Sequence, residues 1–380
     1  MAVVAAALAA FLLSRDGSRG AATTSRRPEG PWGRLERMPF HLEQPPRFLT
    51  PDLCYTQPPA WVLPGFTRER VRELLASADG NARDSAAMVQ SAVCNAEGCT
   101  VTPTANFGLQ LSTTGRETLY QQIGRFEVNT GFAYPYSQPV GEDRWSDLGD
   151  IVDLSLVQRL TWRRGNTVNL SDSHLLCAAA RNDEERLRIV EALTRMSATM
   201  VWLELDRSSD VDALVRYWGR GSSGRDLRPI LRALSQRSGG GRLDVVHLLP
   251  PFVRRRLNTF ALPGDPPRDC YWTALHFFSL SQPLDAFVNG AGAEEILNRD
   301  YEQVPMTSLT LGDVLLFVVP GVGPVHAANH VADDLVFTKN GAHMRRPWSL
   351  LTLDEVRDLY PEATELRAYR LRQLPTAPQL

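Results

Sequence analysis

Apolar and polar positions over the last part of the chain follow the pattern of short strands joined by tight turns. The apolar run 313–319 predicts a buried strand, which a turn at 320–324 connects to a second predicted strand at 325–332. The acidic pair 333–334 has the length of a hairpin turn, and 335–340 then predicts a third strand. This part of the chain is therefore expected to form an antiparallel meander.

The region 48–242 shows apolar residues at helical spacing instead. The periodicity predicts helices that begin near Thr67 and near Asn182, and two more over 210–218 and 226–235. Acidic residues crowd the first turn of the second of these helices, where the helix dipole favours them. The whole region is therefore expected to be mostly helical.

A length of 380 residues is more than one hydrophobic core usually holds, so more than one domain is expected. Residues 15–47 are rich in Arg, Gly, Pro and Ser without periodicity, and the glycines at 239–241 break the helical pattern. We expect 1–47 to be a signal or anchor with a linker, 48–242 a mostly helical domain, and 243–380 a second domain. The predicted fold class is α+β, with the helices and the sheet of the second domain packed together.

Composition and charge narrow the classes of partner. The chain is 43% hydrophobic and 22% charged, which is typical of a folded protein, and 41 basic residues against 43 acidic ones leave a net charge of −2. A nucleic-acid-binding protein needs a basic surplus to displace counterions, so nucleic acid is not expected as a partner. Lys339 is the only lysine, and all other basic residues are arginine.

The N-terminus carries a possible targeting segment. Residues 2–13 form an apolar, Ala-rich run that is too short to span a bilayer but fits the apolar region of a secretory signal. We therefore expect an exported protein, periplasmic or at the cell surface, with membrane association only through this segment. The positive charge usual ahead of such a run is missing, and a frayed terminus on a cytoplasmic protein is the alternative.

The five cysteines suggest disulfides and one remaining thiol. Cys94 and Cys99 flank a tight loop that could close as a disulfide, while Cys54 and Cys177 could form a second bridge or stay as buried thiols. No His or Cys cluster has zinc-ligand spacing, so no metal or cofactor is expected. Cys270 is left over as a candidate nucleophile, although a buried, inert cysteine is the commoner case.

A cysteine at the start of a helix and a histidine on a later strand suggest a nucleophile and its base. The pattern over 268–278 predicts a helix that opens at Asp269 and Cys270, and His326 lies early in the second predicted strand. A helix N-terminus lowers the pKa of a thiol, and a neighbouring imidazole can hold its proton. We therefore expect Cys270 to be the nucleophile and His326 the general base.

The third catalytic residue depends on the register of the predicted hairpin. A two-residue turn places Lys339 on the face of His326, whereas a three-residue loop places Asn340 opposite His326 and Thr338 diagonal to it. An amide oxygen can accept from the imidazole N–H and an ammonium cannot, so the chemistry favours Asn340. Thr338, Lys339 and Asn340 remain the three alternatives, and His330, on the same strand face, is a competing base.

Three features in this order resemble the NlpC superfamily of papain-like cysteine peptidases. They are the pair Asp269-Cys270, the segment 312–317, and His326 ahead of an acidic turn, and the resemblance covers about residues 260–345. It implies a Cys-bearing helix packed on an antiparallel sheet, with Cys270 as nucleophile, His326 as base and the third catalytic position at 338–340. Members of this superfamily cleave peptide or amide bonds, often in the stem peptides of bacterial cell walls.

The sequence thus predicts a cysteine hydrolase that acts on peptide or amide bonds, with peptidoglycan as one candidate substrate. The resemblance departs at Tyr271 and Trp272, where the family commonly has Ser-Gly, and this bulky pair is expected to shape the substrate groove. Asp269 and Lys339 are further expected substrate contacts. A non-catalytic binding or structural protein on the same fold, or an acyl-transferring relative, is the alternative.

Overall fold

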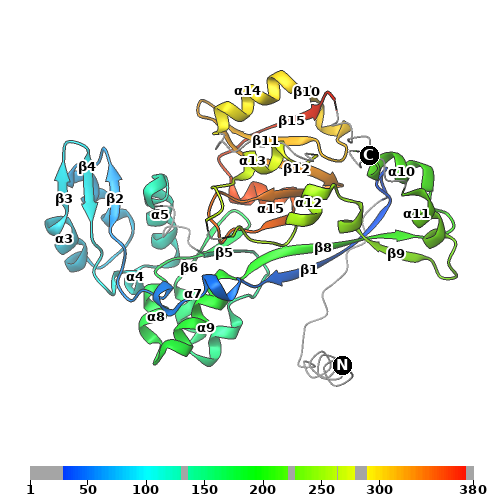
Figure 1. The fold of residues 1–380 in the computed structure, drawn as a ribbon. Helices are drawn as coiled ribbons and strands as arrows, with labels where there is room; N and C mark the ends of the chain where they lie inside the picture. The colour runs from blue at the N-terminus through cyan, green and yellow to red at the C-terminus, as the bar shows by residue number, and fades with distance from the viewer. Residues whose placement is uncertain (1–28, 130–135, 221–226, 263, 279–288, 374–380) are drawn as a thin grey trace.

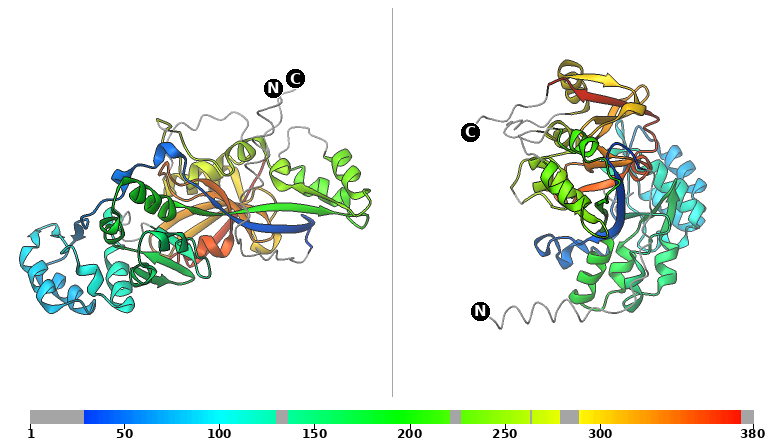
Figure 2. Two further views of the ribbon diagram at one scale, coloured as in Figure 1. Left: turned by 90° about the horizontal axis from the view of Figure 1, so that it is seen from below. Right: turned by 90° about the vertical axis from the view of Figure 1, so that its right-hand side faces the viewer.

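The computed structural model describes residues 29–129, 136–220, 227–262, 264–278 and 289–373. Helices and antiparallel sheets occur together in these residues, which confirms the predicted α+β class. The molecule is elongated, with residues 61–101 at one end and residues 211–218 and 228–235 at the other (Figures 1 and 2). The C-terminal sheet lies between these two ends.

The C-terminal sheet has six antiparallel strands in the order β10-β15-β11-β12-β13-β14. Their bounds are Tyr301–Val304 (β10), Val314–Val319 (β11), Gly323–Ala332 (β12), Leu335–Lys339 (β13), Trp348–Thr352 (β14) and Glu365–Leu371 (β15). Helices α13 (Cys270–Leu275) and α14 (Gly290–Asp300) pack on one face of the sheet, and α15 (Leu353–Leu359) packs on the other. The meander expected over 313–340 is present as β11, β12 and β13.

Two small sheets lie among the helices in the part of the chain before residue 171. The first pairs β2 (Trp61–Pro64), β4 (Gly98–Val101) and β3 (Val93–Asn95), and the second pairs β5 (Tyr136–Pro139), β7 (Thr167–Leu170) and β6 (Thr161–Arg164). The expectation that 48–242 is mostly helical is therefore wrong in this part. These strands have only three or four residues each, which is too short for an alternating pattern to stand out against the helices around them.

The four helices expected over 48–242 are present within the described residues, and the two expected near Thr67 and Asn182 begin at the predicted caps. The Thr67 hydroxyl accepts from the Arg70 N–H, and the Asn182 side chain accepts from the Glu185 N–H, so both satisfy a free donor of the first turn. The helices before the C-terminal sheet are α2 (Arg68–Ser77), α3 (Ala82–Ser91), α4 (Phe107–Gln110), α5 (Thr113–Ile123), α7 (Leu154–Arg159), α8 (His174–Ala179), α9 (Asp183–Thr194), α10 (Val211–Trp218), α11 (Arg228–Ser235) and α12 (Pro251–Arg256).

A third three-stranded sheet links the two ends of the molecule. In it β8 (Met196–Leu205) pairs along its whole length with β1 (Arg34–Leu42) and, near its end, with β9 (Gly241–Asp244). Figure 1 shows β1 and β8 running together below the C-terminal sheet. The linker expected over 15–47 is therefore wrong for β1. Its alternating burial depends on pairing with β8, a strand distant in the sequence that the local pattern does not reveal.

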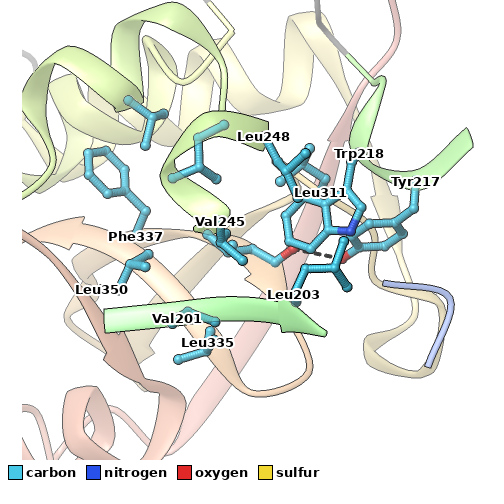
Figure 3. Close-up of a cluster of buried hydrophobic side chains, with 14 of the residues drawn as sticks. Val201, Leu203, Tyr217, Trp218, Val245, Leu248, Leu311, Leu335, Phe337 and Leu350 are labelled. Atoms are coloured by element: carbon cyan, nitrogen blue, oxygen red, sulfur yellow. Dashed lines mark hydrogen bonds between the residues drawn. The ribbon is translucent and has the colours of Figure 1, made fainter. Parts of the chain in front are cut away.

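The boundary expected between residues 242 and 243 does not separate two hydrophobic cores. One cluster combines Val201 and Leu203 of β8 and Trp218 of α10 with Phe337 of β13 and Leu350 of β14. Figure 3 shows these side chains converging, together with Val245 and Leu248 of the 3₁₀ turn Val245–Leu248. The described residues between Val201 and Val253 therefore share a core with the C-terminal sheet, to which Leu35 of β1 also belongs.

A buried arginine joins β1 to the turn between β12 and β13. Arg37 is 6% exposed, and its guanidinium donates to Asp333 Oδ2 at 2.6 Å and to Asp334 Oδ1 at 2.5 Å. A forked guanidinium matches two carboxylates better than a lysine ammonium does. The acidic turn is thus held in place by a strand from the opposite end of the sequence.

Two disulfides close loops of very different length. Cys54 pairs with Cys177 across 123 residues, and Cys94 pairs with Cys99 across 5 residues. Both pairings are among those that the sequence allowed, and Cys270 is left as a buried free thiol. Among the described residues, none of the helices has the length and apolar character needed to cross a bilayer.

We expect the Cys54–Cys177 bridge to contribute more stability than the Cys94–Cys99 bridge. Chain-entropy arguments give about 5 kcal/mol for closing a loop of over 100 residues and about 2 kcal/mol for a loop of a few residues. The double variants Cys54→Ala/Cys177→Ala and Cys94→Ala/Cys99→Ala can be compared by denaturant unfolding. An equal or larger loss in the second variant would contradict the entropic account.

Candidate active site

The register between β12 and β13 changes beside the hairpin turn. Ala332 pairs with Leu335 across the two-residue turn, but a bulge then shifts the ladder so that His330 pairs with Val336 and Asn329 with Phe337. The turn is therefore the two-residue form, while the strands beyond it follow the register expected for a three-residue loop. The bulge resolves the two alternatives left by the sequence, because it adds the extra residue without lengthening the turn.

The backbone pairing between β12 and β13 ends at Asn329 and Phe337. Beyond that point, the side chain of Thr338 makes the contacts to β12. Thr338 Oγ1 donates to the carbonyl oxygen of Ala327 at 3.0 Å and lies 3.0 Å from His326 Nε2. A hydroxyl has one hydrogen, so Thr338 must accept from His326 at Nε2. The neutral imidazole therefore carries its proton on Nε2 and presents an unprotonated Nδ1.

His326 is fully buried, and its Nδ1 has no hydrogen-bond partner. The ring stacks on Tyr360 with 4.4 Å between centroids and meets Phe317 edge-on at 5.5 Å. Burial lowers the pKa of His326 to about 3. A buried nitrogen lone pair that accepts no hydrogen bond is unusual in a folded protein. Packing alone therefore does not explain why a histidine stands at this position.

Cys270 occupies the first position of α13, as the sequence predicts. The Asp269 side chain accepts from the Trp272 N–H and caps the helix. The N–H groups of Ala327, Tyr271 and Cys270 itself point at the sulfur and lower its pKa, but burial together with the Asp269 carboxylate outweighs them and raises the pKa of the Cys270 thiol to about 12. The sulfur thus has thiolate-stabilising donors around it but is a neutral thiol in this structure.

The thiol and the imidazole flank the same short stretch of β12. Cys270 packs with Ala327 and Leu316 on the α13 side of the sheet, whereas His326 pairs with Phe317, whose side chain lies on the α15 side. In the residues that the structure describes, no hydrogen bond joins Cys270 to His326 Nδ1. The expectation that the imidazole neighbours the thiol is therefore not met in this structure, because the two side chains lie on opposite faces of the sheet at β12.

Asn340 does not orient His326, and this expectation is wrong. Its Oδ1 accepts a short hydrogen bond from the Tyr360 hydroxyl, and Thr338 makes the contact with His326 instead. The bulge places Asn340 on the expected face, but the ladder has ended before this residue, so its side chain turns to the residue after α15. Tyr360 was not anticipated, because it comes from a segment whose position depends on the whole sheet.

Lys339 is buried rather than exposed to substrate, which corrects the expected substrate contact. Its Nζ donates to the carbonyl oxygens of Gly341 at 2.7 Å and His343 at 2.9 Å, and it lies over the ring of Trp348. Burial lowers the pKa of Lys339 to about 8. The ammonium therefore holds the loop after β13, and its compact shape explains why a lysine stands here in an arginine-rich chain.

Of the other expected substrate contacts, Asp269 and Tyr271 are buried as well, whereas Trp272 is half-buried. Asp269 is 6% and Tyr271 8% exposed, and Trp272 stacks on His276 with 4.2 Å between ring centroids. His330, the competing base, has both ring nitrogens at backbone carbonyl oxygens, those of Thr310 and Asp333. These contacts assign the histidine at 330 to the structure of the β12–β13 turn.

A hollow of about 720 Å³ lies next to the site. Its lining combines residues of the N-terminal half with the loop after β13, namely Gln44, Tyr136, Ser137, Arg164, Thr167, Asn169, Leu193, Thr194, Arg195, Met196, Asn340, Gly341, His343, Arg345, Arg346, Asp358, Leu359 and Tyr360. Cys270 and His326 do not line it, but Tyr360 does, and this ring stacks directly on His326. The hydrogen-bonded pair of Tyr360 and Asn340 therefore stands between the hollow and the imidazole.

Comparison with protein-family models, with curated proteins and with solved structures finds no match for this chain. In the described part of the chain, no group of three or more His, Cys, Asp or Glu side chains is arranged to hold a metal ion.

We expect the buried His326 to make stability fall at acidic pH. Because its pKa of about 3 lies below the value of about 6.5 in the unfolded chain, the folded form binds fewer protons. The stabilisation is complete above pH 6.5 and is lost as the pH falls towards 3, by about 3 kcal/mol between pH 7 and pH 4. Denaturant unfolding of wild type and His326→Gln at both pH values measures this, and an identical loss in both proteins would contradict it.

Proposed function

We propose that this protein is a cysteine hydrolase of the papain-like, NlpC type that cleaves peptide or amide bonds. Cys270 is the nucleophile, His326 the general base, and Thr338 the residue that orients the imidazole. The observation that carries the proposal is the state of His326: Thr338 holds the proton on Nε2, which leaves a buried Nδ1 lone pair free on β12, the strand whose Ala327 N–H points at the Cys270 sulfur from the other face of the sheet.

In the proposed reaction, Cys270 Sγ attacks the substrate carbonyl carbon while its proton passes to His326 Nδ1. The carbonyl oxygen becomes an oxyanion that accepts from the Cys270 N–H. Nδ1 then returns the proton to the leaving nitrogen as the C–N bond breaks, which leaves a thioester. Water attacks the thioester, gives its proton to Nδ1, and the sulfur leaves and recovers that proton as the acid product is released.

The charge state of the resting pair favours base-assisted attack over a preformed ion pair. A thiol with a pKa of about 12 and an imidazole with a pKa of about 3 are both neutral at pH 7. Proton transfer is therefore coupled to the approach of the carbonyl carbon. Cys270 and His326 lie on opposite faces of the sheet, so the proposed transfer requires a rearrangement at the open end of the β12–β13 ladder that brings the sulfur and Nδ1 together.

A non-catalytic binding protein on the same fold is the second candidate. It is favoured by the burial of both groups, since Cys270 is 5% exposed and His326 is not exposed at all. An acyl-transferring relative would use the same residues and differ only in the acceptor. Incubation with an added amine distinguishes the transferase from the hydrolase, because a transferase incorporates the amine into product and a hydrolase does not.

For the substrate, we propose peptide or amide bonds with peptidoglycan stem peptides as the first to test. This rests on the resemblance of the segment that carries Cys270 and His326. We also propose an exported location, which two disulfides support because such bridges persist in oxidising compartments. The first proposal is tested by incubating the protein with purified peptidoglycan and measuring the release of new amino groups. This release should be absent with Cys270→Ser.

We expect His326 to control the reactivity of Cys270. At pH 7, iodoacetamide should alkylate Cys270 at least about 100-fold faster in wild type than in His326→Gln, because only wild type has a base for the thiol proton. The matched control is His174→Gln, which removes a buried histidine of α8, outside the C-terminal sheet, and should leave the rate within about twofold. Slow labelling that is the same in all three proteins would favour the binding alternative.

We expect Thr338→Val to slow this alkylation and Thr338→Ser to preserve it. Valine keeps the shape of threonine but cannot accept from Nε2–H, so the imidazole proton is free to move to Nδ1 and block the base. A loss of about 10-fold in the valine variant is expected, with melting temperatures used to confirm folding. Equal rates in the two variants would show that Thr338 does not orient His326.

A further inference from the structure

The hollow beside the candidate site contains two arginines without carboxylate partners. Arg164 pairs with Glu362, and Arg195 pairs with Glu43 and Asp147, so the charges of these two are compensated. Among the described residues, no carboxylate lies within ion-pair distance of Arg345 or Arg346. Uncompensated cations in a partly enclosed site attract anions strongly.

The contacts of these two arginines are poor substitutes for an anion. The one hydrogen bond of the Arg346 guanidinium within the described residues goes to the sulfur of Met196 at 3.7 Å, a weak acceptor. Its electrostatic neighbours are the phenols of Tyr136 and Tyr360. Arg345 Nε is buried and has no partner.

A third donor in the same hollow is also unsatisfied. Asn169 of β7 is 3% exposed, and its Nδ2 has no hydrogen-bond partner. One carboxylate, Asp358, lines the hollow too, but it accepts from Asn166. Buried donors without partners are rare in folded proteins, and three residues with spare donor capacity around one hollow indicate a ligand that accepts hydrogen bonds and carries negative charge.

We propose that this hollow binds an oxyanion group of the substrate, with Arg345 and Arg346 as the charged contacts and Asn169 as a neutral donor. The proposal rests on the proposed function, because Tyr360 and Asn340 of the hollow border the imidazole of His326. For a peptide substrate the group is a carboxylate, of an acidic side chain or a chain end. A phosphoryl group shares this chemistry, so the test includes both.

The test measures equilibrium binding of N-acetyl-L-glutamate by isothermal titration calorimetry at constant ionic strength. Wild type should bind it at least about 10-fold more tightly than the neutral N-acetyl-L-glutamine, because a charge-assisted bond to arginine is lost in the amide. Arg346→Gln should remove this preference, and Arg346→Lys should keep part of it. The matched control Arg237→Gln, an exposed arginine of another region, should bind as wild type does.

Each outcome decides the proposal. Equal binding of the acid and the amide by wild type, or unchanged binding in both Arg346→Gln and Arg345→Gln, overturns it. If binding depends on Arg346 and inorganic phosphate binds more tightly than N-acetyl-L-glutamate, the ligand group is a phosphoryl group. If N-acetyl-L-glutamate binds more tightly, the ligand group is a carboxylate. If Arg346→Gln fails to fold, Arg345→Gln and Arg346→Lys carry the test.

Binding and catalysis fail separately in this design. If anion binding depends on Arg346 but Cys270 reacts no faster in wild type than in His326→Gln, the protein has an anion-binding site and is not the proposed hydrolase. Rapid, His326-dependent alkylation without any anion preference leaves the hydrolase and removes the subsite.

Discussion

The candidate site depends on the hydrogen bonds from Arg37 to the acidic turn of Asp333 and Asp334. By binding Asp333 and Asp334 together, the guanidinium of β1 fixes a two-residue turn, and the bulge next to it restores the register that brings Thr338 to His326. A slip of one residue would put Lys339 on the face of the imidazole and Thr338 on the other. The strand β1 belongs to the opposite end of the sequence, so the fold of the N-terminal half and the chemistry of the C-terminal sheet are physically coupled.

The end of the β12–β13 ladder explains why the site has its unusual chemistry. Where backbone pairing stops, the Thr338 hydroxyl donates to the Ala327 carbonyl oxygen and accepts a hydrogen bond from His326 Nε2–H, and the Ala327 N–H points at the Cys270 sulfur. The same enclosure that organises these groups also keeps both neutral, because a charged thiolate or imidazolium would lose its hydration. The burial that positions Cys270 and His326 therefore also disfavours their charged, reactive forms. In the proposed reaction, the negative charge that develops is taken up by the substrate carbonyl oxygen.

The N-terminal half supplies one wall of the hollow rather than a separate domain joined by a linker. Tyr136 and Asn169 face the loop that carries Arg345 and Arg346, and Lys339 holds that loop through two carbonyl oxygens. The single lysine thus stabilises the segment that presents two unpaired arginines. Tyr360 borders both the hollow and His326, so any ligand in the hollow is separated from the imidazole by one aromatic ring.

The sequence by itself determined the local elements: the strands over 313–340, the capped helices that begin at Arg68 and Asp183, and the cysteine at the first position of α13. These depend on spacing and capping within a few residues, which a sequence displays directly. Only the tertiary structure decided that β1 pairs with β8, that the described residues between Val201 and Val253 share the core of the C-terminal sheet, and that Thr338 rather than Asn340 contacts His326. Each of these depends on a partner distant in sequence or on a bulge of one residue, and neither alters the local pattern of polar and apolar positions.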